Sequence, residues 1–196
     1  MPDPEPDEFD WESIQPFVLA SPRSLWPNEV QDLTPWVLGK LDDLGHQLGL
    51  TLELTGTEVP VGTFRADITA KDGTGRSVII ENQLGPSDHV HFGQVVLYAL
   101  ESSADVIIWL VAVEPRWSGW VGLRPEHQRA LERLKVFAGK IEFHGVDVNL
   151  PPAPLLADGL GPQPLPVMTV AVKPSSALLR YQSSSIAAYG NLGFNT

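Results

Sequence analysis

The chain has 196 residues, which is long enough for one domain with a sizeable core, and a formal net charge of −11. Its hydrophobic fraction of 43% excludes a wholly disordered chain, and its charge argues against coating nucleic acid through global positive charge. The absence of cysteine excludes disulfides, zinc–thiolate sites and thiol catalysis. The first residues, MPDPEPDEFDWE, lack the pattern of a signal peptide, and no apolar stretch approaches the roughly 20 residues of a membrane span. We therefore expect a cytoplasmic protein with no membrane partner.

Prolines are concentrated toward the two ends of the chain, and acidic residues are concentrated at its start. Residues 1–12 contain six acids and no base, and without them the net charge falls to −5. Seven of the 18 prolines lie in 2–35 and seven in 151–174, so most regular structure is expected between these stretches. This distribution predicts an acidic, Pro-rich leader (1–23), a folded domain (24–150), a Pro-rich linker (151–166), and an edge strand with a tail (167–196). The leader is either a solvated tail or a nucleic-acid mimic that covers a basic groove.

The hydrophobic pattern predicts an alternation of helices and strands. Thr34 is expected to cap a helix that runs from Pro35 to Gly49. A half-buried strand is expected at 51–57, and strands at 62–70 and 77–83 should form a hairpin across the turn residues 71–75. A helix capped by Ser87 or Asp88 should follow, then a buried strand at 104–113, a helix at 125–138, strands at 141–148 and 167–172, and a weak helix at 175–190. This order predicts an α/β fold with a mixed central sheet flanked by helices.

Two acids in the predicted hairpin are candidates for a metal site. Asp67 lies in the middle of one strand, where Asp is uncommon, and Glu81 ends the next strand. A hairpin can bring the two side by side, and adjacent carboxylates repel unless they share a proton or bind a divalent cation. Two carboxylates with water form an oxygen site that suits Mg²⁺ or Mn²⁺. The alternative is that Asp67 faces solvent and Glu81 simply ends its strand.

The stretches VGTFRAD and IIENQ, followed by QVVLY, resemble the PD-(D/E)XK nuclease superfamily, and in particular its RecB-type branch with a Q-x-x-x-Y motif. The resemblance covers about residues 26–148 and implies the restriction-endonuclease-like αβββαβ core. Asp67 matches the Asp of the motif, Glu81 matches the Glu, and Gln83 stands where Lys is usual. Gln94 and Tyr98 match the Q-x-x-x-Y motif and share a helix face.

The resemblance implies a metal-dependent nuclease that hydrolyses DNA phosphodiester bonds, with RNA not excluded, in DNA repair or in defence against foreign DNA. It implies Mg²⁺ (or Mn²⁺) bound by Asp67, Glu81 and the backbone carbonyl of Asn82, with Glu29 or Asp32 as a candidate further ligand. Gln83 would orient a metal-bound water, while the Q-x-x-x-Y residues would support the metal shell or position the DNA backbone.

An alternative function follows from Gln83, which carries no charge at any pH. The chain would then be a catalytically inactive nuclease-fold module that binds nucleic acid or a protein partner. The sequence leaves the oligomeric state open.

Nucleic-acid contacts are expected where the charge is locally positive. Residues 114–144 contain six bases and four acids and form the only clearly positive region. The candidate contacts are Arg65, His89, His91, Arg116 and Arg124. The competing interpretations are exposed imidazoles in the first turn of a helix, and bases interleaved with solvated acids. Glu53 is expected to face solvent.

Overall fold

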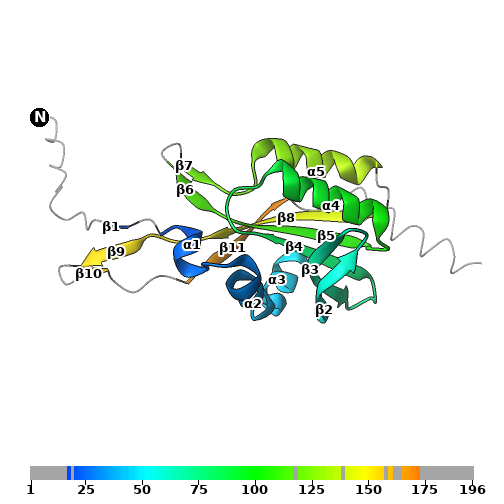
Figure 1. Cartoon of the computed structure of the whole chain (residues 1–196), viewed down its shortest axis with the longest axis horizontal. Helices are drawn as coiled ribbons and strands as arrows, with labels where there is room; N and C mark the ends of the chain where they lie inside the picture. Colours follow the sequence, from blue (N-terminus) through cyan, green and yellow to red (C-terminus); the bar gives the residue numbers. More distant parts are fainter. Residues whose placement is uncertain are drawn as a thin grey trace, which may run out of the picture.

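The computed structural model describes residues 17–18, 20–116, 119–137, 140–156, 159–160 and 165–172 (Figure 1). The expected helix at 175–190 and most of the acidic leader lie outside this part of the chain. The main feature is a six-stranded sheet in the order β11-β8-β5-β4-β3-β2. The strands β4, β5 and β8 are parallel to each other, and the remaining neighbours pair antiparallel. Their bounds are β2 (Leu52–Val61), β3 (Phe64–Asp72), β4 (Ser77–Gln83), β5 (Val106–Ala112), β8 (Glu142–Asn149) and β11 (Val167–Val172).

Helices cover both faces of this sheet. The helices α4 (His89–Glu101) and α5 (Pro125–Phe137) lie on one face, and α2 (Thr34–Leu38) and α3 (Leu41–Leu48) lie on the other (Figure 1). Each face has its own hydrophobic cluster, and every residue of the central strand β5 is buried. Burial on both faces explains why the sequence of β5 is uniformly apolar rather than alternating. Among the described residues, no helix is both long and apolar enough to cross a membrane.

The predicted αβββαβ order is confirmed, since α3 is followed by β2, β3, β4, α4 and β5, and then by α5 and β8. The bounds of β4 and β11 agree with the prediction to the residue. Asp88 caps α4 by accepting hydrogen bonds from two backbone amides of the first turn. Gly49 ends α3 in the left-handed conformation, at φ 74°.

The predicted start of the first long helix is wrong. Helical structure begins earlier, in the π-helical turn η2 (Glu29–Leu33), and Thr34 lies inside the continuous run. Asn28 is the cap because its side chain accepts a hydrogen bond from the Gln31 amide, while its own amide donates to Asp32 Oδ2 at 2.7 Å. Two reciprocal bonds therefore satisfy the helix start, and a threonine cap is not needed.

The predicted alternation in the first strand holds only for its beginning. Leu52 is buried, whereas Leu54 is 47% exposed. The pairing of β2 with β3 shifts between Leu54 and Gly56, and a bulge of this kind changes which side chains face the core. Because β2 lies at the edge of the sheet, some of its apolar side chains can remain exposed to solvent.

Several smaller elements have no counterpart in the prediction. β1 (Phe17–Val18), β9 (Ala153–Leu156) and β10 (Gly159–Leu160) form a three-stranded sheet that extends away from the main sheet (Figure 1). β6 (Glu114–Arg116) pairs with β7 (Gly119–Val121), and α1 (Pro22–Leu25) is a single turn. β1 lies within the predicted leader, and β9 and β10 lie within the predicted linker.

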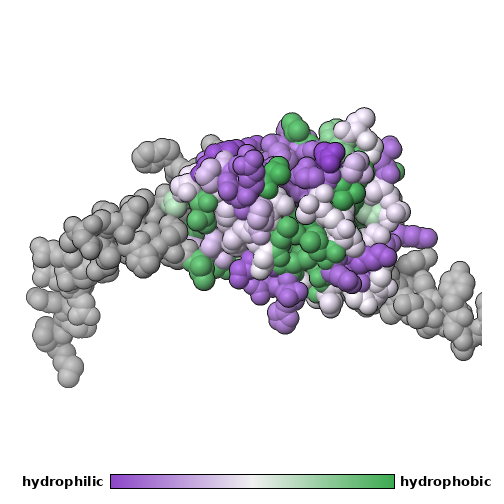
Figure 2. Space-filling model, turned by 60° about the horizontal axis from the view of Figure 1, so that its bottom comes forward, coloured by the Kyte–Doolittle hydropathy of each residue, from purple (hydrophilic) through white to green (hydrophobic). Residues whose placement is uncertain are grey.

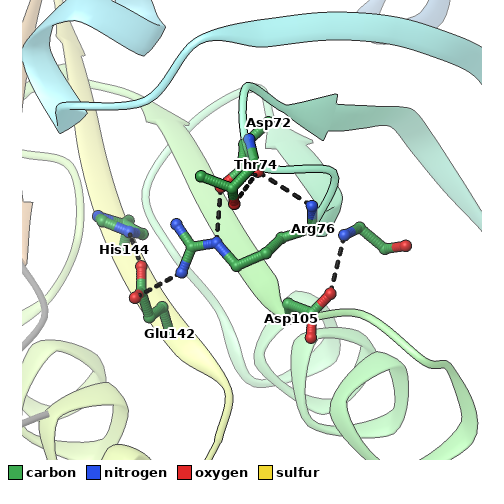
Figure 3. Close-up of polar contacts among 7 residues, drawn as sticks. Asp72, Thr74, Arg76, Asp105, Glu142 and His144 are labelled. Atoms are coloured by element: carbon green, nitrogen blue, oxygen red, sulfur yellow. Dashed lines mark hydrogen bonds and ion pairs between the residues drawn. The ribbon is translucent and has the colours of Figure 1, made fainter. Parts of the chain in front are cut away.

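An ion-pair network closes one end of the main sheet (Figure 3). Arg76 Nε lies 2.6 Å from Asp72 Oδ2, and Arg76 Nη1 lies 2.7 Å from Glu142 Oε1. Asp72 also accepts hydrogen bonds from the amide and hydroxyl of Thr74. Although burial opposes ionisation, these hydrogen bonds lower the pKa of Asp72 to about 2. The network thus joins the β3–β4 turn to the start of β8, next to His144.

The face that carries α2 and α3 has a hydrophobic area near its middle, bordered by hydrophilic residues (Figure 2). A groove between these helices and the segment that leads into β11 is lined by apolar and charged side chains together, including Trp36, Lys40, His46 and Met168. The opposite end of the sheet from the Arg76 network carries the residues that the sequence singled out for chemistry.

Candidate functional site

Asp67 and Glu81 lie opposite each other where β3 and β4 separate. The backbone pairing of these strands runs from Lys71 with Ser77 to Ile68 with Ile80, so the next two residues in register are the two acids. Residues directly opposite each other in an antiparallel pair lie on the same face. The hairpin therefore brings the two acids together, as expected from the sequence. Asp67 is 9% exposed and Glu81 is 3% exposed, so Asp67 does not face solvent.

The Asp67 side chain bridges the gap between the separating strands. Its Oδ2 accepts a hydrogen bond from the backbone amide of Asn82 at 2.7 Å. The Asn82 side chain donates to Thr34 Oγ1 at 3.2 Å, and Thr34 belongs to the helices on the other face. Asn82 therefore borders the acid pair through its backbone alone, and its carbonyl stays a predicted ligand.

Burial and neighbouring negative charges make both acids hard to ionise. Burial is the largest cause that raises the pKa of Asp67 to about 7, partly offset by the hydrogen bond from the Asn82 amide. The pKa of Glu81 rises to about 9, first through burial and then through the negative charge of Asp67. A divalent cation at this position would stabilise both carboxylates in their charged form.

Glu81 Oε2 and Gln83 Oε1 are buried and have no hydrogen-bond partner among the described residues. The Gln83 amide nitrogen donates to the Pro86 carbonyl at 2.8 Å and to Asp88 Oδ2 at 2.9 Å. Both partners accept hydrogen bonds, so they fix the orientation of the amide and leave its oxygen free. Free carboxylate and amide oxygens are the donors that Mg²⁺ and Mn²⁺ prefer, so the residues fit such an ion.

The candidates from the first helical segment differ in their placement. Glu29 Oε2 accepts a hydrogen bond from the Leu84 amide at 2.6 Å, and the Glu29 charge raises the pKa of both Asp67 and Glu81. Glu29 therefore lies at the edge of the acid pair. Asp32 is used by the helix cap. Among the described residues, no group of three or more Asp, Glu or His side chains surrounds a single ion position.

The two residues of the Q-x-x-x-Y pattern both lie on α4. Tyr98 is fully buried, and its hydroxyl donates to the Arg65 carbonyl at 2.8 Å. Burial and the nearby Glu81 carboxylate raise the Tyr98 pKa, so the phenol stays protonated. Gln94 lies one turn earlier on the same helix face and is half-buried, and its side chain makes no hydrogen bond to another described residue.

A chain of hydrogen bonds that the sequence did not predict holds the start of α4 against the start of α5. Ser87 Oγ lies 2.7 Å from His127 Nδ1, and His127 Nε2 lies 3.0 Å from His89 Nδ1. Ser87 Oγ also accepts a hydrogen bond from the Arg124 amide at 2.8 Å, which leaves its single proton for His127. Burial, followed by the charge of His89, lowers the pKa of His127. Ser87 and His127 are 40 residues apart, so no local signal could reveal the contact.

The predicted nucleic-acid contacts have different surroundings. His91 Nδ1 lies 3.0 Å from the Asp88 carboxylate, while His89 belongs to the hydrogen-bond chain described above. The Arg65 side chain is 59% exposed and lies 3.6 Å from Glu58. Arg124 contacts this region through its backbone amide, which donates to Ser87 Oγ. The side chain of Arg116, at the end of β6, lies outside the described side chains.

Neither a protein-family model nor a curated protein matches the chain. Three solved structures resemble parts of it. EndoMS in a complex with double-stranded DNA is 16% identical over 55% of this chain and 42% of that one, with a TM-score of 0.36. A repair endonuclease from Pyrococcus abyssi is 14% identical over 50% and 41%, with a TM-score of 0.35. SfsA from Pyrococcus furiosus in complex with Ca²⁺ is 11% identical over 72% and 63%, with a TM-score of 0.39.

The chain therefore spans about two fifths of the first two proteins and somewhat less than two thirds of the third. At these scores the similarities are partial resemblances of fold and carry no weight for the chemistry of the site.

Proposed function

We propose that the chain is a metal-dependent nuclease of PD-(D/E)XK type that hydrolyses phosphodiester bonds in DNA, with RNA as a substrate still to be tested. The observation that carries this proposal is the buried pair of Asp67 and Glu81, whose charges repel each other at the point where two strands separate. A buried acid pair of this kind is costly to the fold, and a divalent cation offsets the cost. Repair, or defence against foreign DNA, is the setting that the sequence resemblance implies.

Each residue of the site would have a separate role. Asp67 and Glu81 would hold Mg²⁺ or Mn²⁺, with Glu29 at the edge of the site. When bound, such an ion neutralises phosphate charge and lowers the pKa of a coordinated water. The free Oε1 of Gln83 would accept a hydrogen bond from the attacking water and so orient it. Tyr98 ties α4 to the β3 backbone beside Asp67 and would keep the two acids in register.

One observation favours the second candidate, an inactive nuclease-fold module that binds nucleic acid or a protein partner. Both amide protons of Gln83 are used by Pro86 and Asp88, so this side chain has no donor left for the charge that develops on the phosphate. A lysine at this position could stabilise that charge, and Gln83 cannot.

A cleavage assay with matched variants distinguishes the two candidates. The purified protein is incubated with linear duplex, circular and single-stranded DNA and with RNA, in Mg²⁺ or Mn²⁺. We expect cleavage by the wild type and by the Glu53→Ala control, which removes an exposed acid of β2, and none by Asp67→Ala or Glu81→Ala. Equal cleavage by all four proteins would contradict the proposal. No cleavage by the wild type in any mixture would support the inactive module.

A further inference from the structure

Glu58 has a strained backbone close to the acid pair. It is the only non-glycine residue with positive φ, at 53°, in the part of the chain that the structure describes. This left-handed conformation costs about 1–2 kcal/mol for a residue with a Cβ atom. Such strain persists where the surrounding structure enforces it, and it clusters at functional sites. Glu58 lies within the edge strand β2, and Glu is not one of the residue types that favour the left-handed conformation.

The strand pairing places Glu58 next to Asp67. The flanking pairs are Thr57 with Ile68 and Val59 with Ala66, so Glu58 occupies the position opposite Asp67. The order across the sheet is therefore Glu58 on β2, Asp67 on β3 and Glu81 on β4. The charge of Glu58 contributes to the raised pKa values of the other two acids.

The two oxygens of the Glu58 carboxylate have different surroundings. Oε2 lies 3.6 Å from Arg65 Nε, which is a long contact to a side chain that is 59% exposed. Oε1 is buried and has no hydrogen-bond partner among the described residues, although the Glu58 side chain as a whole is 35% exposed. A buried acceptor without a partner is costly, and an ion or its bound water is a common explanation.

An independent observation indicates a ligand at the same place. Glu81 is 97% buried and its Oε2 has no partner among the described residues. With Glu29, four acids from four different elements approach one region, and the described bases that act on it are the exposed Arg65 and the His91 imidazole. The excess of negative charge favours a bound cation.

We propose that Glu58 is a further cation-binding residue of this site and that it acts through water bound to the divalent ion. This inference rests on the proposed function, because it assumes that Asp67 and Glu81 hold that ion. Because the described residues contain no group of three acids around one ion position, we assign Glu58 to the waters of the ion rather than to the ion itself. Mg²⁺ and Mn²⁺ keep several waters when they bind, and a nearby carboxylate accepts hydrogen bonds from them.

Direct measurement of Mn²⁺ binding tests this role without measuring activity. Isothermal titration calorimetry at pH 8 compares the wild type with Glu58→Gln, Asp67→Asn and the control Glu53→Gln, which removes one charge from an exposed position of the same strand. We expect Glu58→Gln to weaken Mn²⁺ binding about 10-fold or more, as for other residues that contact metal-bound water. Asp67→Asn should weaken binding further, and the control should stay close to the wild type.

The outcomes separate this inference from the proposed function. If Asp67→Asn loses the ion while Glu58→Gln binds it as tightly as the control, the role of Glu58 is overturned and the proposed function stands. If Asp67→Asn binds Mn²⁺ like the wild type, both are overturned. A second variant, Glu58→Gly, accepts the left-handed conformation and removes the strain. It should unfold at the same or a higher temperature than the wild type without the ion, yet bind Mn²⁺ more weakly, and wild-type affinity would overturn the inference.

Discussion

Replacing Asp67 with Asn should stabilise the cation-free protein at high pH. Asn has nearly the same shape, and its side-chain oxygen can still accept the hydrogen bond from the Asn82 amide. The substitution removes only the charge, which is buried beside Glu81 and is only partly compensated by the Asn82 amide and His91. An ionised Asp67 is costly to bury, so replacing it with a neutral side chain should increase the free energy of unfolding.

The magnitude follows from the pKa of Asp67, which burial raises from 3.8 to about 7. The folded state binds the Asp67 proton more tightly than the unfolded chain does. The contribution of protonated Asp67 to the free energy of unfolding is therefore fully present below about pH 4. This contribution decreases as the pH rises and is completely lost above the folded-state pKa of about 7. The loss is on the order of 4 kcal/mol at 1.36 kcal/mol per pH unit. For a chain of this size that corresponds to about 10 °C in melting temperature.

Thermal unfolding at pH 4 and pH 8 in a chelator tests this prediction. The wild type and Asp67→Asn should melt at similar temperatures at pH 4, and the variant should melt about 10 °C higher at pH 8. Added Mg²⁺ should raise the melting temperature of the wild type at pH 8 and leave the variant unchanged. Asp42→Asn, on an exposed part of α3, is the control. The reasoning would be refuted by a variant that is equally stable or less stable than the wild type at pH 8.

Three further predictions concern the surroundings of the site. Arg76→Met removes charged hydrogen bonds to two buried carboxylates, so the free energy of unfolding should fall by about 2 kcal/mol in urea titrations at pH 7. Because the pKa of Asp72 is lowered, its share of this loss should disappear as the pH falls from about 4 to about 2. Ser87→Ala leaves the His127 ring nitrogen without its partner, which should cost about 1–3 kcal/mol in the same titration, and an unchanged midpoint would disprove the contact. Gln83→Lys keeps a donor for both acceptors and adds a positive charge, so cleavage in Mg²⁺ should rise, whereas Gln83→Met should unfold more readily and cleave no faster.

The elements that could be predicted are those whose signal is local. The strand β4 is predicted to the residue because an apolar, β-branched run follows the turn residues directly. The two-residue period of strand side chains places Glu81 and Gln83 on one face, and the short turn places Asp67 opposite Glu81. The start of the helical run in η2 is missed because Asn28 and Asp32 satisfy it in a π-helical turn, which has no distinct sequence pattern.

The residues that could not be predicted depend on contacts between distant segments or on backbone geometry. His127 contacts Ser87 although the two are 40 residues apart in the sequence, and no local pattern near either residue indicates the contact. Glu58 is a typical solvated residue by its type, and its role depends on a left-handed conformation that glycine or asparagine would normally signal. The same holds for the free oxygen of Gln83, which becomes evident only when both partners of its amide nitrogen are known.

The most direct test of the account is to locate the ion itself. Crystals grown or soaked in Mn²⁺ and measured at the manganese absorption edge show each bound ion as an anomalous peak. The account predicts a peak in contact with the carboxylates of Asp67 and Glu81, and no such peak in crystals of Asp67→Asn. A Mn²⁺ peak elsewhere with none between these two acids, at concentrations that support cleavage, would contradict it.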